Sequence, residues 1–237
     1  MKYVLFDLDG TLLPLNTDEF VNGYLKALSK KIANYIEPDI FVPKLLKATE
    51  AMVLNLEEKT NEEVFAEHFF RDCFEDKEGI LKQFEEFYLN EFKNLQIHAT
   101  THESHVSEML DYLKSKDVGI VIATNPLFPL TAIKERLSWI DISEYEFDLI
   151  TSYEKMKYCK PHLQYYEQIL EEINANPEDC LMVGNDMQED MVASKLGMKT
   201  FLLEGYLIDR NTSYIEPTYR GSYLDLQDCI MKLCKNI

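Results

Sequence analysis

The sequence predicts an α/β fold in which helices cover both faces of a parallel sheet. Short, continuous apolar runs recur along the chain, and turn residues or helical patterns follow them, as expected of strands buried between two helical layers. A long helical stretch separates the first of these runs from the second. The chain has 237 residues, 46% of them hydrophobic and 12% aromatic, which is enough apolar material for one sizeable core.

The expected strands are four clear apolar runs and one weaker run. The clear runs are residues 3–8, 119–124, 180–183 and 199–203, and the weaker one is 147–151. Amphipathic helices are expected at 103–115, with Thr101 as its N-cap, at 163–173, and from about 189 to the glycine at 197. This alternation of strand and helix predicts a doubly wound, Rossmann-like parallel sheet.

The long helical stretch covers residues 17–92 and contains no convincing strand. Its periodic segments are residues 19–35, 41–54, 61–74 and 78–91. Because a connection of this length inside a compact domain usually has structure and work of its own, we expect an inserted helical cap over the carboxyl edge of the sheet. The expected division is an α/β core of residues 1–15 and 97–237 and a cap of residues 16–96.

The charge and the cysteines restrict the partners and the compartment. The formal net charge is −18, from 42 acidic and 24 basic residues, so binding to nucleic acid or to an anionic membrane is not expected. The same acidic surface favours a monomer and leaves a dimer open. Five cysteines without metal-ligand spacing indicate free thiols in a reducing compartment, and no apolar run reaches the ~20 residues of a membrane span. We therefore expect a cytoplasmic protein.

Two carboxylates leave the end of the first expected strand, at Asp7 and Asp9. In an extended segment they point the same way, and two neighbouring anions require a cation to neutralise them. Mg²⁺ suits such an all-oxygen, partly hydrated site, so we expect a bound divalent metal here. The following Gly10 allows a sharp turn, and Thr11 is placed to donate a hydrogen bond to a phosphate oxygen.

Three later groups of polar residues also lie next to expected strands or helices, and ligands of doubly wound sheets bind at the carboxyl ends of the strands. Thr124 and the backbone N–H of Asn125 form a cradle for an anion. Lys160, fixed by the following Pro161, is placed to hold the charge of a nucleophile and a phosphate together. Residues 183–190 supply further carboxylates after another core strand.

These four groups occur in the order and strand context of the haloacid dehalogenase superfamily, which this sequence resembles. The string Asp-x-Asp-Gly-Thr at residues 7–11 is specific, and the expected helical insertion resembles the cap of relatives such as phosphoglycolate phosphatase and β-phosphoglucomutase. The resemblance implies a Mg²⁺-dependent phosphatase that hydrolyses a small phosphorylated metabolite through an aspartyl-phosphate.

The resemblance also implies a role for each matched residue. Asp7 is the nucleophile that takes the phosphoryl group, and Asp9 is the acid towards the leaving alcohol and then the base towards water. Asp7 through its carboxylate and Asp9 through its backbone carbonyl also hold Mg²⁺. Thr124 and the amide of Asn125 bind phosphoryl oxygens, and Lys160 neutralises charge in the transition state.

The fourth group departs from the commonest pattern of the family, which has Gly-Asp with a second Asp some residues later. Here Gly184 is followed by Asn185, Asp186 comes next, and Asp190 lies beyond. Either Asp186 fills the metal position, or Asn185 fills it with a neutral oxygen and Asp190 supports it. We favour Asp186, because an anionic ligand holds Mg²⁺ better.

Asp9 and Asn185 are the residues that bear on the alternatives to a phosphatase. In the superfamily that the sequence resembles, dehalogenases and phosphonate hydrolases lack an acid at the position of Asp9, and ion-pumping ATPases carry a lysine there. The resemblance therefore points away from these branches and towards a reaction that protonates an alkoxide. A phosphomutase uses the same residues and differs in how the cap excludes water. A binding or regulatory protein on a retired phosphatase fold is the rival from another class, and Asn185 is the feature in its favour. The ester itself stays open among sugar phosphates, nucleotides and phosphoglycolate-like acids.

Overall fold

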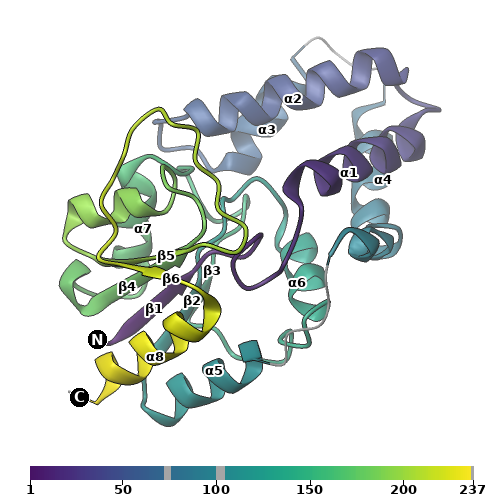
Figure 1. The fold of residues 1–237 in the computed structure, drawn as a ribbon. Helices are drawn as coiled ribbons and strands as arrows, with labels where there is room; N and C mark the ends of the chain where they lie inside the picture. Colours follow the sequence, from purple (N-terminus) through teal and green to yellow (C-terminus); the bar gives the residue numbers. More distant parts are fainter. Residues whose placement is uncertain (72–75, 100–104, 236–237) are drawn as a thin grey trace.

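The computed structural model describes residues 1–71, 76–99 and 105–235. Within these ranges six strands form one sheet in the order β3-β2-β1-β4-β5-β6, and every pairing is parallel. The strands are β1 (Tyr3–Phe6), β2 (Gly119–Ile122), β3 (Leu149–Ile150), β4 (Cys180–Gly184), β5 (Lys199–Leu203) and β6 (Tyr219–Gly221). The predicted fold class is confirmed, and the carboxyl ends of the strands lie at one edge of the sheet (Figure 1).

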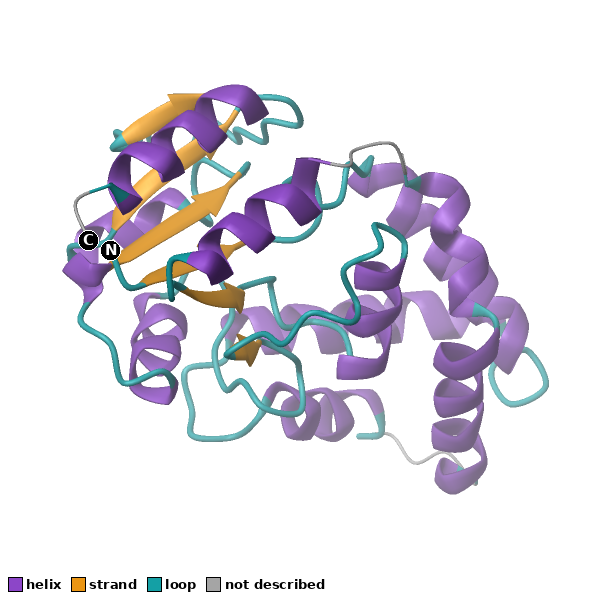
Figure 2. Ribbon diagram, turned by 90° about the horizontal axis from the view of Figure 1, so that it is seen from below, coloured by secondary structure: helices purple, strands orange, loops and turns teal. Residues whose placement is uncertain are grey.

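Helices cover both faces of the sheet (Figure 2). They are α5 (His105–Ser115), α6 (Leu130–Ser138), α7 (Leu163–Glu172) and α8 (Tyr223–Cys234). Successive side chains of β1 point to opposite faces. Val4 and Phe6 are fully buried in one cluster with apolar residues of α5 and α8, whereas Leu5 is fully buried in a second cluster with residues of α7.

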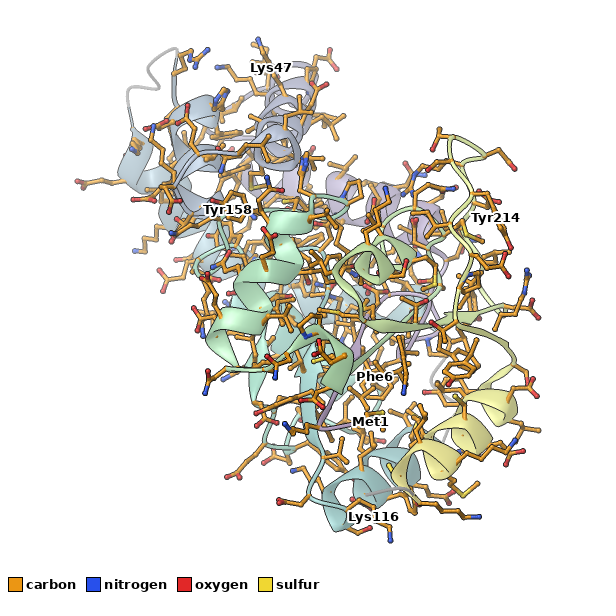
Figure 3. All side chains as sticks on the ribbon, turned by 90° about the vertical axis from the view of Figure 1, so that its left-hand side faces the viewer. Met1, Phe6, Lys47, Lys116, Tyr158 and Tyr214 are labelled. Atoms are coloured by element: carbon orange, nitrogen blue, oxygen red, sulfur yellow. The ribbon has the colours of Figure 1, made fainter. Side chains whose placement is uncertain are left out.

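A helical unit lies beyond the carboxyl edge of the sheet (Figure 1). Between β1 and β2 the described chain forms α1 (Thr17–Ile32), α2 (Pro38–Leu54), α3 (Asn61–Phe69), α4 (Lys77–Asn90) and the 3₁₀ helix η1 (Phe92–His98). Figure 3 shows Lys47 of α2 at the opposite end of the molecule from Lys116. Leu15 and Ala99 pair in an antiparallel bridge, so the segments that enter and leave the unit lie side by side.

Local sequence accounts for the helix starts in this unit. The side chain of Asn16 accepts a hydrogen bond from the backbone N–H of Glu19 at 3.2 Å, which caps α1. Thr60 and Glu63 form a reciprocal capping box at the start of α3. Both helices therefore begin where the sequence supplies an acceptor for their unpaired N–H groups.

Aromatic side chains join the helical unit to α6. The ring of Phe92 stacks on Trp139, with centroids 5.8 Å apart, and Phe20 of α1 meets Trp139 edge-on at 6.2 Å. The ring centroid of Phe128, in the loop before α6, lies 6.0 Å from that of Phe20. These contacts fix the position of α6, a helix that the sequence did not predict.

Other elements differ from expectation. The segment expected as an α-helix at 189–197 is a 3₁₀ helix, η3 (Met191–Leu196), which ends as expected at Gly197 with a φ of 99°. β6, α8 and the short 3₁₀ helix η2 (Pro177–Asp179) were not predicted. The expected N-cap Thr101 and the end of the expected helix 61–74 lie outside the described residues.

The structure bears on two expectations from composition, which concern membrane spans and cysteines. Over the residues it describes, no helix is long and apolar enough to cross a bilayer. Of the five cysteines, Cys159, Cys180, Cys229 and Cys234 are free thiols, and Cys73 lies outside the described residues.

Candidate functional site

The turn that leaves β1 is held to the sheet by its backbone. The N–H of Asp7 donates to the carbonyl of Val183 in β4 at 2.9 Å, so the first residue of the turn lies at the carboxyl edge. Gly10 has a φ of +81°, and a Cβ atom at this position would lie 2.4 Å from Nδ2 of Asn185. The turn therefore requires glycine both for its left-handed backbone and for the close approach of Asn185.

Lys160 binds two buried carboxylates. Its Nζ lies 2.8 Å from Oδ1 of Asp7 and 2.6 Å from Oδ1 of Asp190, and the lysine side chain is only 1% exposed. Burial by itself lowers the pKa of Lys160, but the facing carboxylates of Asp190 and Asp7 raise this pKa well above its ordinary value. Lys160 is therefore a fixed positive charge beside Asp7.

The end of β2 lies next to this pair. The N–H of Ala123 donates to the carbonyl of Phe6 at 2.7 Å, so Thr124 and Asp7 follow neighbouring strand ends. Thr124 is buried, and its carbonyl accepts hydrogen bonds from the hydroxyls of Thr151 and Tyr165. These bonds hold the strand end in place.

The Asn125 side chain connects three of the predicted groups. Its Oδ1 accepts a hydrogen bond from the backbone N–H of Lys160 at 3.2 Å, and its Nδ2 donates to Oε2 of Glu189 at 3.2 Å. The backbone N–H of Asn125, which is the predicted phosphate ligand, is not used by either bond. The structure thus brings Asn125 together with the lysine segment and the loop after β4.

Thr11 lies between two oxygen atoms rather than alone. Its hydroxyl is 3.3 Å from Oδ2 of Asp7 and 3.1 Å from Oδ1 of Asn185. The Nδ2 of Asn185 donates to the carbonyl of Tyr206 at 2.6 Å, so the amide is oriented with its oxygen towards Thr11. Asp7 and Asn185 therefore turn oxygen atoms towards one point.

The Asp186 carboxylate is engaged elsewhere. Its Oδ1 accepts hydrogen bonds from the backbone N–H groups of Gln188 (3.0 Å) and Glu189 (2.8 Å), and its Oδ2 pairs with Nη1 of Arg210 at 2.5 Å. Both carboxylate oxygens of Asp186, the residue favoured from the sequence for the metal position, are thus hydrogen-bonded within the chain. Of the two residues weighed from the sequence, Asn185 is the one that lies with Thr11 and Asp7.

Asp190, expected from the sequence only as support for the metal position, binds Lys160 in the structure. One of its oxygens binds Lys160, and Oδ2 accepts a hydrogen bond from the backbone N–H of Asp186 at 2.9 Å. A Cβ atom on Gly184 would lie 2.0 Å from Oδ2 of Asp190, so the glycine makes room for this carboxylate. Asp190 therefore positions Lys160 and the loop after β4.

Asp9 pairs with an arginine that the sequence did not predict as a site residue. Nη1 of Arg136, in α6, donates to Oδ2 of Asp9. Among the described residues, Oδ1 of Asp9 and Nη2 of Arg136 are buried without a hydrogen-bond partner. Burial raises the pKa of Asp9, and the positive charge of Arg136 opposes that shift.

Arg136 itself is held between rings. It is fully buried, and its guanidinium lies 4.7 Å from the ring centroid of Phe128 and 5.8 Å from that of Phe20. Its Nε donates to the carbonyl of Ala132 at 3.4 Å. The sequence offered one signal for it, a charged residue on the apolar side of a short helix, but that helix was itself not predicted.

The donors at this edge fit a hard cation. Over the residues described, no group of three or more His, Cys, Asp and Glu side chains gathers as a metal cluster. The oxygens of Asp7 and Asn185 nevertheless both lie within 3.3 Å of the Thr11 hydroxyl. A carboxylate oxygen and an amide oxygen are ligands of the all-oxygen kind that Mg²⁺ binds with several waters retained.

Comparisons with known sequences assign the chain to a group of proteins. The family profile described as "Haloacid dehalogenase-like hydrolase" matches residues 4–203. The pyrimidine 5′-nucleotidase PynA of Streptococcus pneumoniae is 30% identical over 241 residues, covering 98% of this chain and 95% of that protein. The pyrophosphatase PpaX of Bacillus cereus is 24% identical, covering 99% of this chain and 96% of that protein.

Solved structures share the fold. A HAD phosphatase from Thermococcus onnurineus superposes with a TM-score of 0.59 at 18% identity, covering 97% of this chain and 98% of that one. The HAD-hydrolase YfnB from Bacillus subtilis, a structure bound to magnesium, has a TM-score of 0.56 at 18% identity, covering 98% of each chain. At this identity the similarity concerns the arrangement of the elements.

Proposed function

The chain belongs to the haloacid dehalogenase-like hydrolase family and is a phosphatase of that family, and we propose that it hydrolyses a small phosphate monoester in two steps through Asp7. The observation that carries this proposal is the buried cluster in which Lys160 binds Asp7 at 2.8 Å and Asp190 at 2.6 Å. A carboxylate fixed beside a permanent positive charge is oriented for attack and tolerates the approach of an anionic phosphate.

In the first step a carboxylate oxygen of Asp7 attacks phosphorus, and the bond from phosphorus to the ester oxygen breaks. Asp9 gives its proton to that departing oxygen. In the second step Asp9 takes a proton from water, the water oxygen attacks phosphorus, and the bond to Asp7 breaks. Inorganic phosphate leaves, and Asp7 and Asp9 return to their starting states.

Three ligands from this chain would hold Mg²⁺: the carboxylate of Asp7, the backbone carbonyl of Asp9 and the amide oxygen of Asn185. We favour Asn185 over Asp186 because the Asp186 carboxylate already pairs with Arg210 and two backbone N–H groups. The bound ion would neutralise and orient the transferring phosphoryl group. Thr124 and the N–H of Asn125 bind the other oxygens of the phosphoryl group.

Arg136 acts as a positioning residue for Asp9. The guanidinium holds one carboxylate oxygen of Asp9 and is itself fixed against the rings of Phe20 and Phe128. A planar, always charged group suits this task, because its fork of donors sets the direction of the carboxylate as well as its charge. The acid is thereby kept in one orientation between turnovers.

The helical unit serves as the cap, which the sequence places at residues 16–96. The end of α2 and the loop after it are hydrogen-bonded to the segment around Lys160. Asn55 donates to the carbonyl of Lys157 at 2.9 Å, and the carbonyl of Val53 lies 2.8 Å from Nε2 of His162. A cap at this edge excludes bulk water and protein-sized esters. The similarity to a pyrimidine 5′-nucleotidase supports a small phosphorylated metabolite as the substrate.

The test is phosphate release from a panel of small phosphate esters, measured with Mg²⁺ and with excess chelator. We expect release that requires Mg²⁺ and that Asp7→Asn lowers by a factor on the order of a thousand or more, because an amide is a poor nucleophile. Asp18→Asn, which changes an exposed aspartate of α1, is the matched control. Turnover retained by Asp7→Asn contradicts the mechanism, and no release from any ester favours a phosphomutase.

A further inference from the structure

A cavity of about 740 Å³ lies between the helical unit and the loops that follow β2 and β3. Residues of α1, α2, α3 and α4 form one side, and residues 127–131, 153 and 154 form the other. Its aromatic lining consists of Tyr24, Phe65, Phe84, Tyr88, Phe128 and Tyr153. Cavities that hold small molecules have roughly this size, about 300–1,000 Å³, and this mostly apolar lining.

The cavity begins close to the predicted phosphate site. Leu127 lines it and is two residues from Asn125, so their Cα atoms are at most about 7 Å apart. A hydrogen bond of 2.8 Å from the N–H of Leu127 to the carbonyl of Asn125 tightens this segment further. An ester whose phosphate binds Asn125 therefore has the cavity within reach of its leaving group.

One aromatic side chain contacts both the cavity and the arginine that binds Asp9. The ring of Phe128 lines the cavity and also packs on the guanidinium of Arg136, which binds Asp9. The same ring lies 5.2 Å from the ring of Tyr24, in an edge-on arrangement. The cavity and the catalytic turn are therefore neighbours across one aromatic layer.

The charges at the cavity disfavour an anionic occupant. Among the described lining residues, the carboxylates of Glu62, Glu63, Glu85 and Glu154 outnumber the ammonium group of Lys77. Burial raises the pKa of Glu62, and repulsion from Glu154 and Glu63 adds to the shift. A leaving group with a second negative charge would meet this field at close range.

Two tyrosine hydroxyls lie next to each other in the aromatic part of the lining. The phenol oxygens of Tyr24 and Tyr88 lie 2.8 Å apart and share one hydrogen bond. Burial raises the pKa of Tyr24 to about 12, so it carries no charge near neutral pH. Such a pair has donor and acceptor capacity left for an uncharged nitrogen or oxygen of a ligand.

We propose that this cavity receives the leaving group of the substrate and selects phosphate monoesters whose leaving group ends in an uncharged aromatic or heteroaromatic ring. Such a ring packs edge-on or offset against Tyr24, Tyr88 and Phe128, which an open-chain alcohol does not. Esters with a carboxylate or a second phosphate on the leaving group are rejected by the glutamates at the cavity. The assignment rests on the proposed function, whose phosphate site it extends.

The experiment compares benzyl phosphate, 4-carboxybenzyl phosphate and ethyl phosphate with the full-length protein and Mg²⁺. We expect kcat/KM to be at least about tenfold higher for benzyl phosphate than for either other ester. Ala66 lines the cavity on α3, so Ala66→Phe fills part of it. This variant should lower kcat/KM for benzyl phosphate by about tenfold and leave kcat/KM for ethyl phosphate unchanged. Ala33→Phe, at an exposed position outside the lining, is the control.

A second variant tests the charge without filling space. Glu62→Lys should raise the ratio of kcat/KM for 4-carboxybenzyl phosphate to that for benzyl phosphate by about fivefold. Glu78→Lys, an equal change in the first turn of α4 outside the lining, should leave the ratio unaltered. Because each ratio is measured on one preparation, partial unfolding of a variant does not alter it.

Two results overturn the inference while leaving the proposed function intact. One is equal hydrolysis of all three esters, with Ala66→Phe lowering each alike. The other is a dimer of the native chain that Ala66→Phe converts to a monomer, since the cavity would then hold a second copy. Failure of the proposed function has a different signature, because no ester, including ethyl phosphate, would release phosphate in a Mg²⁺-dependent way.

Discussion

Arg136 and Lys160 place positive charge on the two carboxylates of the turn after β1. Lys160 binds Asp7, the proposed nucleophile, and Arg136 binds Asp9, the proposed acid. Both cations are almost fully buried, at 1% side-chain exposure. Because a buried charge without its partner is costly, each pair also fixes the orientation of the carboxylate it binds.

The role of Arg136 predicts a dependence on the leaving group. We expect Arg136→Met to lower kcat/KM for ethyl phosphate by about 100-fold, because an alkoxide cannot leave without a well-placed acid. For 4-nitrophenyl phosphate, whose phenolate leaves unprotonated, we expect a loss below about tenfold. The measurement is the ratio of the two kcat/KM values, which does not depend on the folded fraction of the variant.

Asp9→Asn is the reference for this pattern and should change the ratio in the same direction. Arg136→Lys should recover part of it, since an ammonium group restores the charge but not the fork geometry. Equal losses for both esters would mean that Arg136 contributes only to stability.

The connection from α2 to α3 is the element that ties the helical unit to the lysine segment. The Nδ2 of Asn55 lies within hydrogen-bond distance of the carbonyls of Glu57 and Lys59, both at 3.3 Å, and of Lys157 at 2.9 Å. The N–H of Asn61 donates to the carbonyl of Met156 at 2.8 Å. In Figure 3, Tyr158 lies at the boundary between the helical unit and the rest of the molecule.

Asn55 therefore organises both its own loop and the docking of that loop. We expect Asn55→Ala to lower the free energy of unfolding by about 1–3 kcal/mol, because it removes the amide donor of three partly buried hydrogen bonds. Chemical denaturation measures this. Asn90→Ala, which removes one exposed bond within α4, is the matched control and should cost less than about 0.5 kcal/mol. Equal costs for the two variants would refute the docking role.

At the scale of the whole molecule, a net charge of −18 means that any cation screens the repulsion within the folded chain. A specific Mg²⁺ site differs from this screening, because an ion that binds only the native state stabilises it by mass action. The two effects are separated by comparing Mg²⁺ with a sodium salt of the same ionic strength.

The proposed site predicts a Mg²⁺-specific rise in thermal stability. At a concentration 100 times its Kd, Mg²⁺ should add about 2.7 kcal/mol, a rise in Tm of about 5–10 °C for a chain of this length. We expect Asp186→Ala to keep this rise and Asn185→Ala to lose most of it. The reverse order, measured by calorimetry, would return the metal position to Asp186.

Several elements could be predicted from the sequence because their signal is local. β1, β2, β4 and β5 are continuous apolar runs, and burial on both faces requires such runs in any parallel sheet. β6 was missed because its three residues, Tyr219–Gly221, pair at the sheet edge and are not apolar. α6 was missed because its buried face includes Arg136, which breaks the apolar pattern.

The sequence by itself determined the fold class and the groups of residues that meet at the carboxyl edge, because strand ends in a parallel sheet converge there whatever the loops do. Only the tertiary structure decided which side chains of these groups contact one another. Neighbours in sequence such as Asn185 and Asp186 have similar chemistry, and the positions of Tyr206 and Arg210 determine which of them faces Asp7. The pairing of Arg136 with Asp9 is likewise a long-range contact between residues 127 positions apart, for which no local pattern exists.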